Sequence, residues 1–135
     1  MNKPELRAFI EKVETLVKLS ERALTREQSA PIVNHFSKDV YAREMRLAKG
    51  TLIIGEIHKF ENLNILSQGT VAVISQDGVK VIEAPYTFVG TPGAKRVIYA
   101  HENAVWTTVH GTSLRDLSAI EEHFIAKEYL QIEGE

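Results

Sequence analysis

Residues 50–69, GTLIIGEIHKFENLNILSQG, form the stretch on which the fold prediction rests. The stretch reads as a glycine, five residues, Glu56-Ile57-His58, three residues, Asn62, six residues and a second glycine. Its segments 51–58 and 62–67 are rich in residues that favour strands, and the two glycines punctuate them as turn residues do. The stretch therefore predicts two strands that carry a carboxylate, an imidazole and an amide at fixed intervals.

The β pattern continues on both sides of this stretch. From Asp39 onward the hydrophobic period is two, and turn signals separate short segments. The predicted strands are residues 40–47, 51–58, 62–67, 70–75, 79–83, 86–89, 95–100 and 104–110. Asp77-Gly78 marks the clearest hairpin, because both central positions of a type I′ turn need positive φ. About eight short strands in close succession predict a closed or sandwiched antiparallel sheet.

Helices are predicted at both ends of the strand region. Near the N-terminus, apolar residues recur at helical steps between Lys and Glu, with Pro4 in the first turn. This amphipathic stripe comprises Leu6, Phe9, Ile10, Val13, Leu16, Val17 and Leu24. Residues 28–38, around Pro31, are interpreted as a connector. A short helix over 114–126 should pack against the sheet through its apolar stripe, which includes Leu117, Ile120 and Phe124.

The composition is that of a globular protein and excludes several functions. Of the 135 residues, 44% are apolar and 25% are charged. The net charge of −2, without a basic stripe, predicts no binding to nucleic acid or to an anionic membrane. The chain has neither an apolar run of about eighteen residues nor a signal-peptide core, so we expect a cytoplasmic protein. Because cysteine is absent, His and carboxylates are the only strong metal ligands.

The spacing in residues 50–69 resembles the first motif of the cupin superfamily. That motif is Gly, five residues, His-x-His, three or four residues, Glu, six residues and Gly. Here Glu56 stands at the first His position and Asn62 at the Glu position, so only His58 keeps the family's residue type. The second cupin motif resembles residues 90–100, GTPGAKRVIYA, in which Arg96 takes the position of the last metal-binding His and Ala100 that of the Asn.

The resemblance covers about residues 41–110 and implies a mainly β fold with a single cupin-type, jelly-roll antiparallel β-barrel. The predicted organisation is one folded domain. Residues 1–38 form the N-terminal helix and connector, 39–111 the cupin-like barrel, and 112–135 the C-terminal helix and tail. The chain also resembles short cupin-like proteins encoded by tailed bacteriophages. The resemblance further implies a homodimer that associates through sheet edges, and unpaired edge strands favour such pairing.

Alternation along residues 51–58 places four side chains on one face: Leu52, Ile54, Glu56 and His58. The resemblance implies that this face points into the barrel, opposite Arg96. On the last strand, Trp106, Thr108 and His110 share one face. The other face carries valines and is expected to be the core side.

The first of three functional hypotheses is a metal site. In it, Glu56 and His58 bind a divalent metal together with His110 or His101, because two His and one carboxylate are a common ligand set. Such a site implies the dioxygenase, isomerase or lyase chemistry of metal cupins. Arg96 argues against it, since it places a fixed positive charge where the family binds its cation.

The second hypothesis, which the sequence favours, is a metal-free site for a small anionic molecule. Arg96 anchors the anion through its planar fork of donors, and Asn62 and His110 complete the binding site. Glu56 raises the pKa of His58, and the two act as a general acid–base pair. Metal-free cupins that act on sugar nucleotides offer a precedent by resemblance.

The third hypothesis is a relic. In it, Glu56, His58 and Arg96 form a buried network that has no substrate, and the protein has a structural or interaction role, for instance in a phage particle. Whether the chain is an enzyme is left open at this stage.

Overall fold

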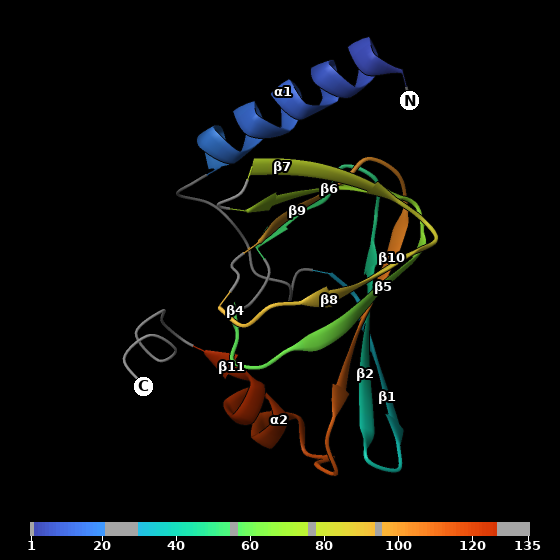
Figure 1. Cartoon of the computed structure of the whole chain (residues 1–135), viewed down its shortest axis with the longest axis vertical. Helices are drawn as coiled ribbons and strands as arrows, with labels where there is room; N and C mark the ends of the chain where they lie inside the picture. The colour runs from blue at the N-terminus through green and yellow to red at the C-terminus, as the bar shows by residue number, and fades with distance from the viewer. Residues whose placement is uncertain (1, 21–29, 55–56, 76–77, 94–95, 127–135) are drawn as a thin grey trace.

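The computed structural model of the chain describes residues 2–20, 30–54, 57–75, 78–93 and 96–126, which are mainly β-strand (Figure 1). In chain order its elements are α1 (Lys3–Ser20), β1 (Ile32–Ser37), β2 (Val40–Leu47), β3 (Leu52–Ile54), β4 (Ile57–His58), β5 (Asn62–Gln68), β6 (Thr70–Ser75), β7 (Gly78–Glu83), β8 (Tyr86–Gly90), β9 (Val97–Ala100), β10 (Ala104–Gly111), α2 (Leu117–Phe124) and β11 (Ile125–Ala126). All described strand pairs are antiparallel. The predicted mainly β, antiparallel fold is confirmed.

The strands form two larger sheets and one short ladder. The five-stranded sheet has the order β1-β2-β10-β5-β8, the four-stranded sheet has the order β3-β9-β6-β7, and β4 pairs with β11. Side chains of both larger sheets meet in one core, to which Met45 and Trp106 come from the first sheet and Ile53 and Ile98 from the second. The sheets therefore pack face to face as a sandwich.

The expected closed barrel is not formed. No ladder between described residues joins the five-stranded sheet to the four-stranded sheet. The chain instead passes from one sheet to the other through turns and through the separate β4–β11 ladder. The interior consequently has sides where loops and α2, rather than a continuous sheet, form the wall.

The two ends of the strand predicted for residues 51–58 belong to different ladders. β3 pairs with β9 in the four-stranded sheet, whereas β4 pairs with β11. Leu52 packs toward α1, and His58 lines a cavity beside α2. Because these two surroundings lie on different sides of the sheet, the expectation that Leu52 and His58 share one face is wrong. Glu56 lies outside the described residues.

Residues 32–37 form a strand and not the connector that the sequence predicted. β1 pairs with β2 from Ile32↔Met45 to Ser37↔Val40, which leaves Lys38 and Asp39 for the turn. Asp39 has a φ of 59°, a left-handed conformation that Asp adopts more readily than most residues. The strand was not predicted because it lies at the edge of the sheet, where its mostly exposed side chains give no apolar alternation.

The face of β10 that points inward was also predicted incorrectly. Trp106, Thr108 and His110 are buried, and the valines of this strand face outward and are half-buried. The inward face is buried because the four-stranded sheet and α2 cover it. On the outer face, Leu63 of the neighbouring β5 stays exposed.

The predicted β6–β7 hairpin is confirmed. Ser75 pairs with Gly78, and residues 76–77 between them lie outside the described residues. Gly78 itself has a φ of 107°, a value that a side chain would make unfavourable.

Helix α1 lies across the outer face of the four-stranded sheet (Figure 1). Asn2 caps it, because its side-chain oxygen accepts a hydrogen bond of 2.8 Å from the backbone N–H of Glu5. Phe9 packs against Tyr99 and His101, with ring centroids 5.8 Å and 4.4 Å away. At Phe9 the predicted stripe thus covers a sheet of its own chain. Leu24 lies outside the described residues.

Helix α2 begins at Leu117, later than predicted, because Asp116 caps it by accepting a hydrogen bond of 3.3 Å from the N–H of Ala119. Ile120 and Phe124 are buried as expected, but Leu117 is about half exposed. The helix closes one end of the sandwich through contacts with Tyr41. Neither described helix is long and apolar enough to span a membrane.

Candidate functional site

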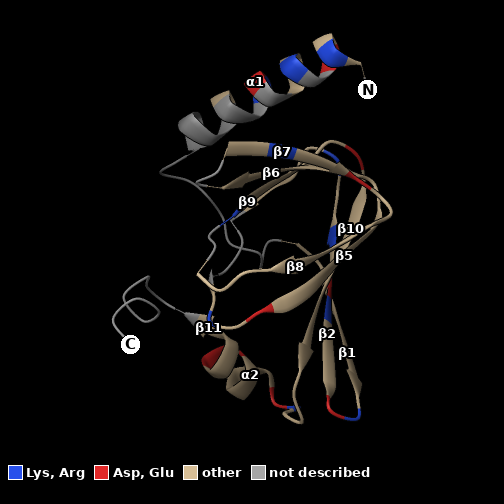
Figure 2. Cartoon of the chain, viewed as in Figure 1, with Lys and Arg blue, Asp and Glu red and all other residues tan. Residues whose placement is uncertain are grey.

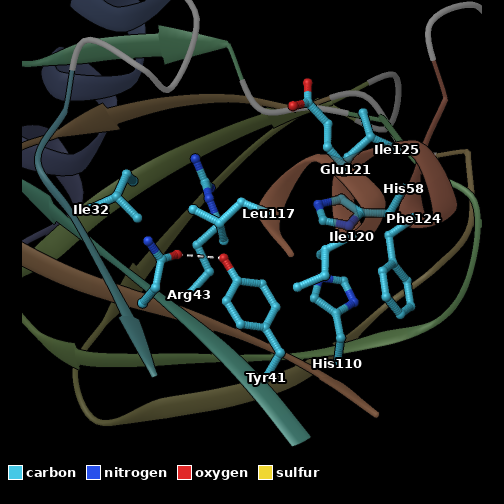
Figure 3. Close-up of a pocket in the computed structure, with 11 residues that line it drawn as sticks. Ile32, Tyr41, Arg43, His58, His110, Leu117, Ile120, Glu121, Phe124 and Ile125 are labelled. Carbon is cyan, nitrogen blue, oxygen red and sulfur yellow. Dashed lines mark hydrogen bonds between the residues drawn. The ribbon is translucent and has the colours of Figure 1, made fainter. Parts of the chain in front are cut away.

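A cavity of about 260 Å³ lies between the inner face of the five-stranded sheet and helix α2 (Figure 3). We call it the imidazole cavity. The residues that line it are Ile32, Asn34, Tyr41, Arg43, His58, His110, Leu117, Ile120, Glu121, Phe124 and Ile125. They come from β1, β2, β4, β10, α2 and β11, so the cavity depends on segments far apart in the sequence.

Backbone pairing fixes the two histidines of this cavity. His110 lies near the end of β10, where it shares the buried face with Trp106 and Thr108. His58 pairs with Ile125 in the β4–β11 ladder, and its carbonyl oxygen accepts a hydrogen bond of 3.0 Å from the N–H of Gly93. Because β11 follows α2 directly, the ladder holds α2 and His58 together.

The two imidazole rings are stacked. Their centroids lie 5.2 Å apart, with an angle of 21° between the ring planes. The ring of His110 also lies 4.3 Å from that of Phe124 and 6.2 Å from that of Tyr41. Figure 3 shows His110 between these two aromatic rings, with the carboxylate of Glu121 directed away from both imidazoles. These aromatic contacts hold the His110 ring in place.

Both histidines have a buried Nδ1 atom that lacks a hydrogen-bond partner among the described residues. Such atoms are uncommon in folded proteins, and leaving a buried polar group unsatisfied costs about 1–3 kcal/mol. Two of them side by side at one cavity indicate a place where a ligand or ordered water completes the hydrogen bonding.

Burial and neighbouring positive charges keep both imidazoles neutral. Burial, and after it His110, Arg96 and Arg43, together lower the pKa of His58 to about 3. Burial and then Arg43 lower the pKa of His110 to about 4. At neutral pH each ring therefore offers one N–H donor and one nitrogen lone pair.

The residues that strand β2 contributes to the cavity were not predicted from the sequence. Tyr41 and Arg43 both point inward, and the hydroxyl of Tyr41 donates a hydrogen bond of 2.6 Å to Oδ1 of Asn34. The signal was present, because alternation in residues 40–47 places Arg43 between Tyr41 and Met45, two buried side chains. An arginine on the buried face of a strand is a candidate site residue.

Asn62, a predicted binding residue, belongs to a buried amide network. Its Oδ1 accepts a hydrogen bond of 2.6 Å from Nδ2 of Asn64, and its own Nδ2 donates one of 3.3 Å to the carbonyl oxygen of Phe60. Oδ1 of Asn64 in turn accepts bonds from Trp106 Nε1 and Thr108 Oγ1, at 3.0 Å and 2.9 Å. Asn62 is not among the residues that line the imidazole cavity.

Arg96, the predicted anion anchor, does not line the imidazole cavity either. Its guanidinium lies over the ring of Phe88, 5.5 Å from the centroid, and it borders a different cavity between β6, β7 and β8. Burial lowers the pKa of Arg96 from its ordinary value. The structure thus brings His58 and His110 together and places Arg96 and Asn62 elsewhere.

The described residues do not assemble the metal site of the metal-binding cupins. Across these parts of the chain, no three His, Asp or Glu side chains are placed to hold a metal ion together. His101, one of the two candidates for the third ligand, packs on Phe9 outside the sandwich. Glu56 lies outside the described residues, so the metal hypothesis stays a prediction.

Figure 2 shows blue and red segments on both sheets, so neither sign of charge is confined to one sheet.

No protein-family model and no curated protein matches the sequence. Solved structures do match. A cupin 2 domain-containing protein from Halorhodospira halophila is similar over 76% of this chain and 81% of its own, with a TM-score of 0.54 and 13% identity. A cupin superfamily protein from Desulfitobacterium hafniense DCB-2 matches over 70% and 87%, with a TM-score of 0.53 and 14% identity.

A putative ethanolamine utilization protein Q from Salmonella typhimurium LT2 matches over 67% of this chain and 80% of its own, with a TM-score of 0.53 and 9% identity. At such identities the matches inform about fold and leave the activity open. The resemblance seen in residues 50–69 is confirmed at that level, and the chain has the fold of the cupin superfamily.

Proposed function

We propose that the protein binds a small anionic molecule in the imidazole cavity and needs no metal to do so. The observation that carries the proposal is the pair of neutral, stacked imidazoles with unpartnered buried Nδ1 atoms beside Arg43. The binding residues are therefore His58, His110 and Arg43, and not Arg96 and Asn62 as the sequence suggested.

The positive charge around the cavity favours an anion. Arg43 lowers the pKa of both imidazoles, and Arg96 lowers that of His58, which means that their positive potential reaches these rings. The same potential attracts a carboxylate or phosphate, and each ring can donate one hydrogen bond to it. A bound anion raises the pKa of the imidazoles, because an opposite charge nearby favours their protonated form.

The size of the cavity fits a small ligand. Its volume of about 260 Å³ lies just below the usual range for drug-sized ligands, about 300–1,000 Å³. It also exceeds by several times the roughly 30 Å³ that one water occupies. A cavity too small for a few waters would have favoured a purely structural role, and this cavity is not of that kind.

Binding of inorganic phosphate, acetate and succinate, measured by calorimetry at pH 5.5 and pH 8, tests the proposal. At least one of these anions should bind more tightly at pH 5.5, with proton uptake, since binding raises the imidazole pKa values. Arg43→Gln and His110→Gln should each weaken binding about tenfold or more. His35→Gln, at an exposed histidine on the outer face, is the matched control. Absence of binding by all three anions at millimolar concentration would refute the proposal.

A second candidate function is a divalent metal site formed by His58, His110 and Glu56. One observation favours it: neutral imidazoles are the form that binds metal, and here two of them are stacked 5.2 Å apart. The charges of Arg43 and Arg96 oppose it. Protein purified without chelators should contain less than one first-row metal per chain. A stoichiometric metal that is lost in His58→Ala would overturn the metal-free proposal.

Four other expectations remain predictions. They are that Glu56 acts with His58 as an acid–base pair, that the chain forms a homodimer, that it resides in the cytoplasm and that it is related to phage proteins. Light scattering at micromolar concentration checks the dimer, and a clean monomer would contradict it.

A further inference from the structure

A second cavity, of about 390 Å³, opens between the edges of the two sheets on the side of β7 and β8. We call it the arginine cavity. The residues that define its chemistry are Lys80, Tyr86, Phe88, Val89 and Arg96, and Val73, Ser75, Gly78, Val79 and Ile82 of β6 and β7 complete it. The imidazole cavity shares none of its lining residues. Its volume is within the usual range for small-molecule sites.

Arg96 supplies a positive charge that lacks a carboxylate partner among the described residues. Its guanidinium stacks over Phe88, with Cζ 5.5 Å from the ring centroid. The side chain is half-buried. A guanidinium held over an aromatic ring keeps its N–H donors for an anion. Within the described part of the chain, Arg96 therefore has the geometry of an anion anchor that no carboxylate occupies.

Lys80 and Tyr86 add a second cation and a hydroxyl to the same cavity. Nζ of Lys80 donates a hydrogen bond of 2.8 Å to the Tyr86 hydroxyl oxygen and lies 5.2 Å from the ring centroid. Because that oxygen accepts, its own proton is left to donate elsewhere. No Asp or Glu is among the described residues that line the cavity.

The walls between these polar groups are aromatic and aliphatic. Phe88 packs on Tyr86 and, edge to face, on Trp106, with centroids 5.7 Å and 5.4 Å apart. These contacts fix the Phe88 ring at the base of the cavity. Val89 is exposed at its rim. A ligand that fits such a lining has a flat apolar part for Phe88 and one negatively charged group for Arg96 and Lys80.

We propose that the arginine cavity is a second ligand site, which takes an aromatic compound bearing one carboxylate or phosphate. The site is separate from the imidazole cavity and does not depend on the function proposed for it. Arg96 and Lys80 bind the anionic group, Tyr86 donates a hydrogen bond to it, and Phe88 stacks on the ring.

Binding of phenyl phosphate and benzoate to the isotope-labelled full chain, followed by NMR, tests this site. The backbone amide signals of Lys80, Phe88 and Arg96 should shift. Benzyl alcohol, which has the ring alone, and inorganic phosphate, which has the charge alone, should bind there about tenfold more weakly or worse. The ratio of the phenyl phosphate and benzoate affinities tells which anionic group the site prefers.

Two variants distinguish recognition of the anionic group from non-specific hydrophobic binding. Lys80→Met and Arg96→Gln should each weaken phenyl phosphate binding about tenfold and leave benzyl alcohol binding unchanged. Lys38→Met, in the turn between β1 and β2, is the matched control and should behave as the wild type. If Arg96→Gln does not fold, Lys80→Met decides alone, because Lys80 is exposed.

Three results would overturn the second site. One is equal affinity for benzyl alcohol and phenyl phosphate, and another is undiminished phenyl phosphate binding in Lys80→Met. The third is a shift of the His58 and His110 signals in place of those around Arg96. That last outcome would move the aromatic anion to the imidazole cavity, and would therefore support the proposed function while refuting this inference.

Discussion

The two ends of the sandwich interior are built from the same strands but have opposite chemistry. At one end, Met45 of β2 and Trp106 of β10 pack with fully buried aliphatic residues such as Ile53. Four residues further along β10 and four residues back along β2, the same inward faces carry His110 and Tyr41. The first end is apolar, whereas the second contains a cavity, two neutral imidazoles and an arginine.

The two ends of the interior contribute differently to the stability of the fold. Apolar burial stabilises the fold by about 25 cal/mol per Å² removed from water. Buried imidazoles with unpartnered nitrogens destabilise it. A cavity with polar groups beside a well-packed core is typical of a binding site. Residues that serve function commonly lower the stability of the fold. The predictions below vary one end at a time.

The largest effect is expected at the apolar end. Leu66→Ala should lower the free energy of unfolding by about 2–5 kcal/mol, because Leu66 is 0% exposed and its loss leaves a cavity in the core. Leu63 lies on the same strand but is 46% exposed, so Leu63→Ala should cost no more than roughly 0.5–1 kcal/mol. Urea unfolding measures both. Similar losses for the two variants would mean that the inner and outer faces of β5 are misassigned.

The amide network between the two ends should give the next effect. Asn64 is 2% exposed, and Asn64→Ala leaves the Trp106 N–H and the Thr108 hydroxyl without their acceptor. Each stranded group costs about 1–3 kcal/mol. In a double-mutant cycle with Thr108→Val, the two losses should be less than additive. Full additivity would show that the network is not coupled.

The imidazole end should make stability depend on pH. In the unfolded chain both histidines take up protons near their ordinary pKa of 6.5, but in the folded chain only near 3 and 4. The unfolded state therefore binds more protons between these values. The contribution is complete above about pH 6.5 and is lost as the pH falls toward 4, at up to about 1.4 kcal/mol per pH unit for each histidine.

Unfolding measured from pH 7 to pH 4 checks this dependence. His110→Gln should flatten the curve relative to that of the wild type. A wild-type curve that is flat over this range would contradict the neutral state of the imidazoles.

The smallest change in stability is expected from an apolar replacement at the imidazole end. His110→Leu removes a side chain that is 4% exposed and has an unpartnered Nδ1, so stability should stay within about 1 kcal/mol of the wild type or rise. Phosphate binding should be lost in the same variant. A loss of stability as large as that of Leu66→Ala would show that His110 is a structural residue.

The sequence predicted the fold class because the information for it is local. Alternation, turn glycines and motif spacing located the strands that carry His58, Asn62 and His110, and the two-sheet cupin fold follows from them. Edge strand β1 was missed, since a strand with exposed side chains leaves no hydrophobic period. The pairing of β3 and β4 with different strands was not predicted, because alternation gives no sign of which strands pair.

The site could be predicted only in part, because it depends on tertiary packing. His58 and His110 were named from spacing and strand faces, and the structure brings them together. Arg96 was placed with them by motif position alone, whereas it borders a cavity between β6, β7 and β8. Arg43 and Phe124 reach the cavity through β2 and through the α2–β11 connection, which no motif marks.

The most direct test of the account is a proton NMR titration of the imidazole signals, with and without phosphate. Of the five histidines in the chain, His58 and His110 should titrate below about pH 5 in the free protein. His58→Gln and His110→Gln assign their signals. Saturating phosphate should raise both pKa values. Titration of both histidines near pH 6.5, or pKa values that no anion moves, would contradict the neutral imidazole pair as an anion site.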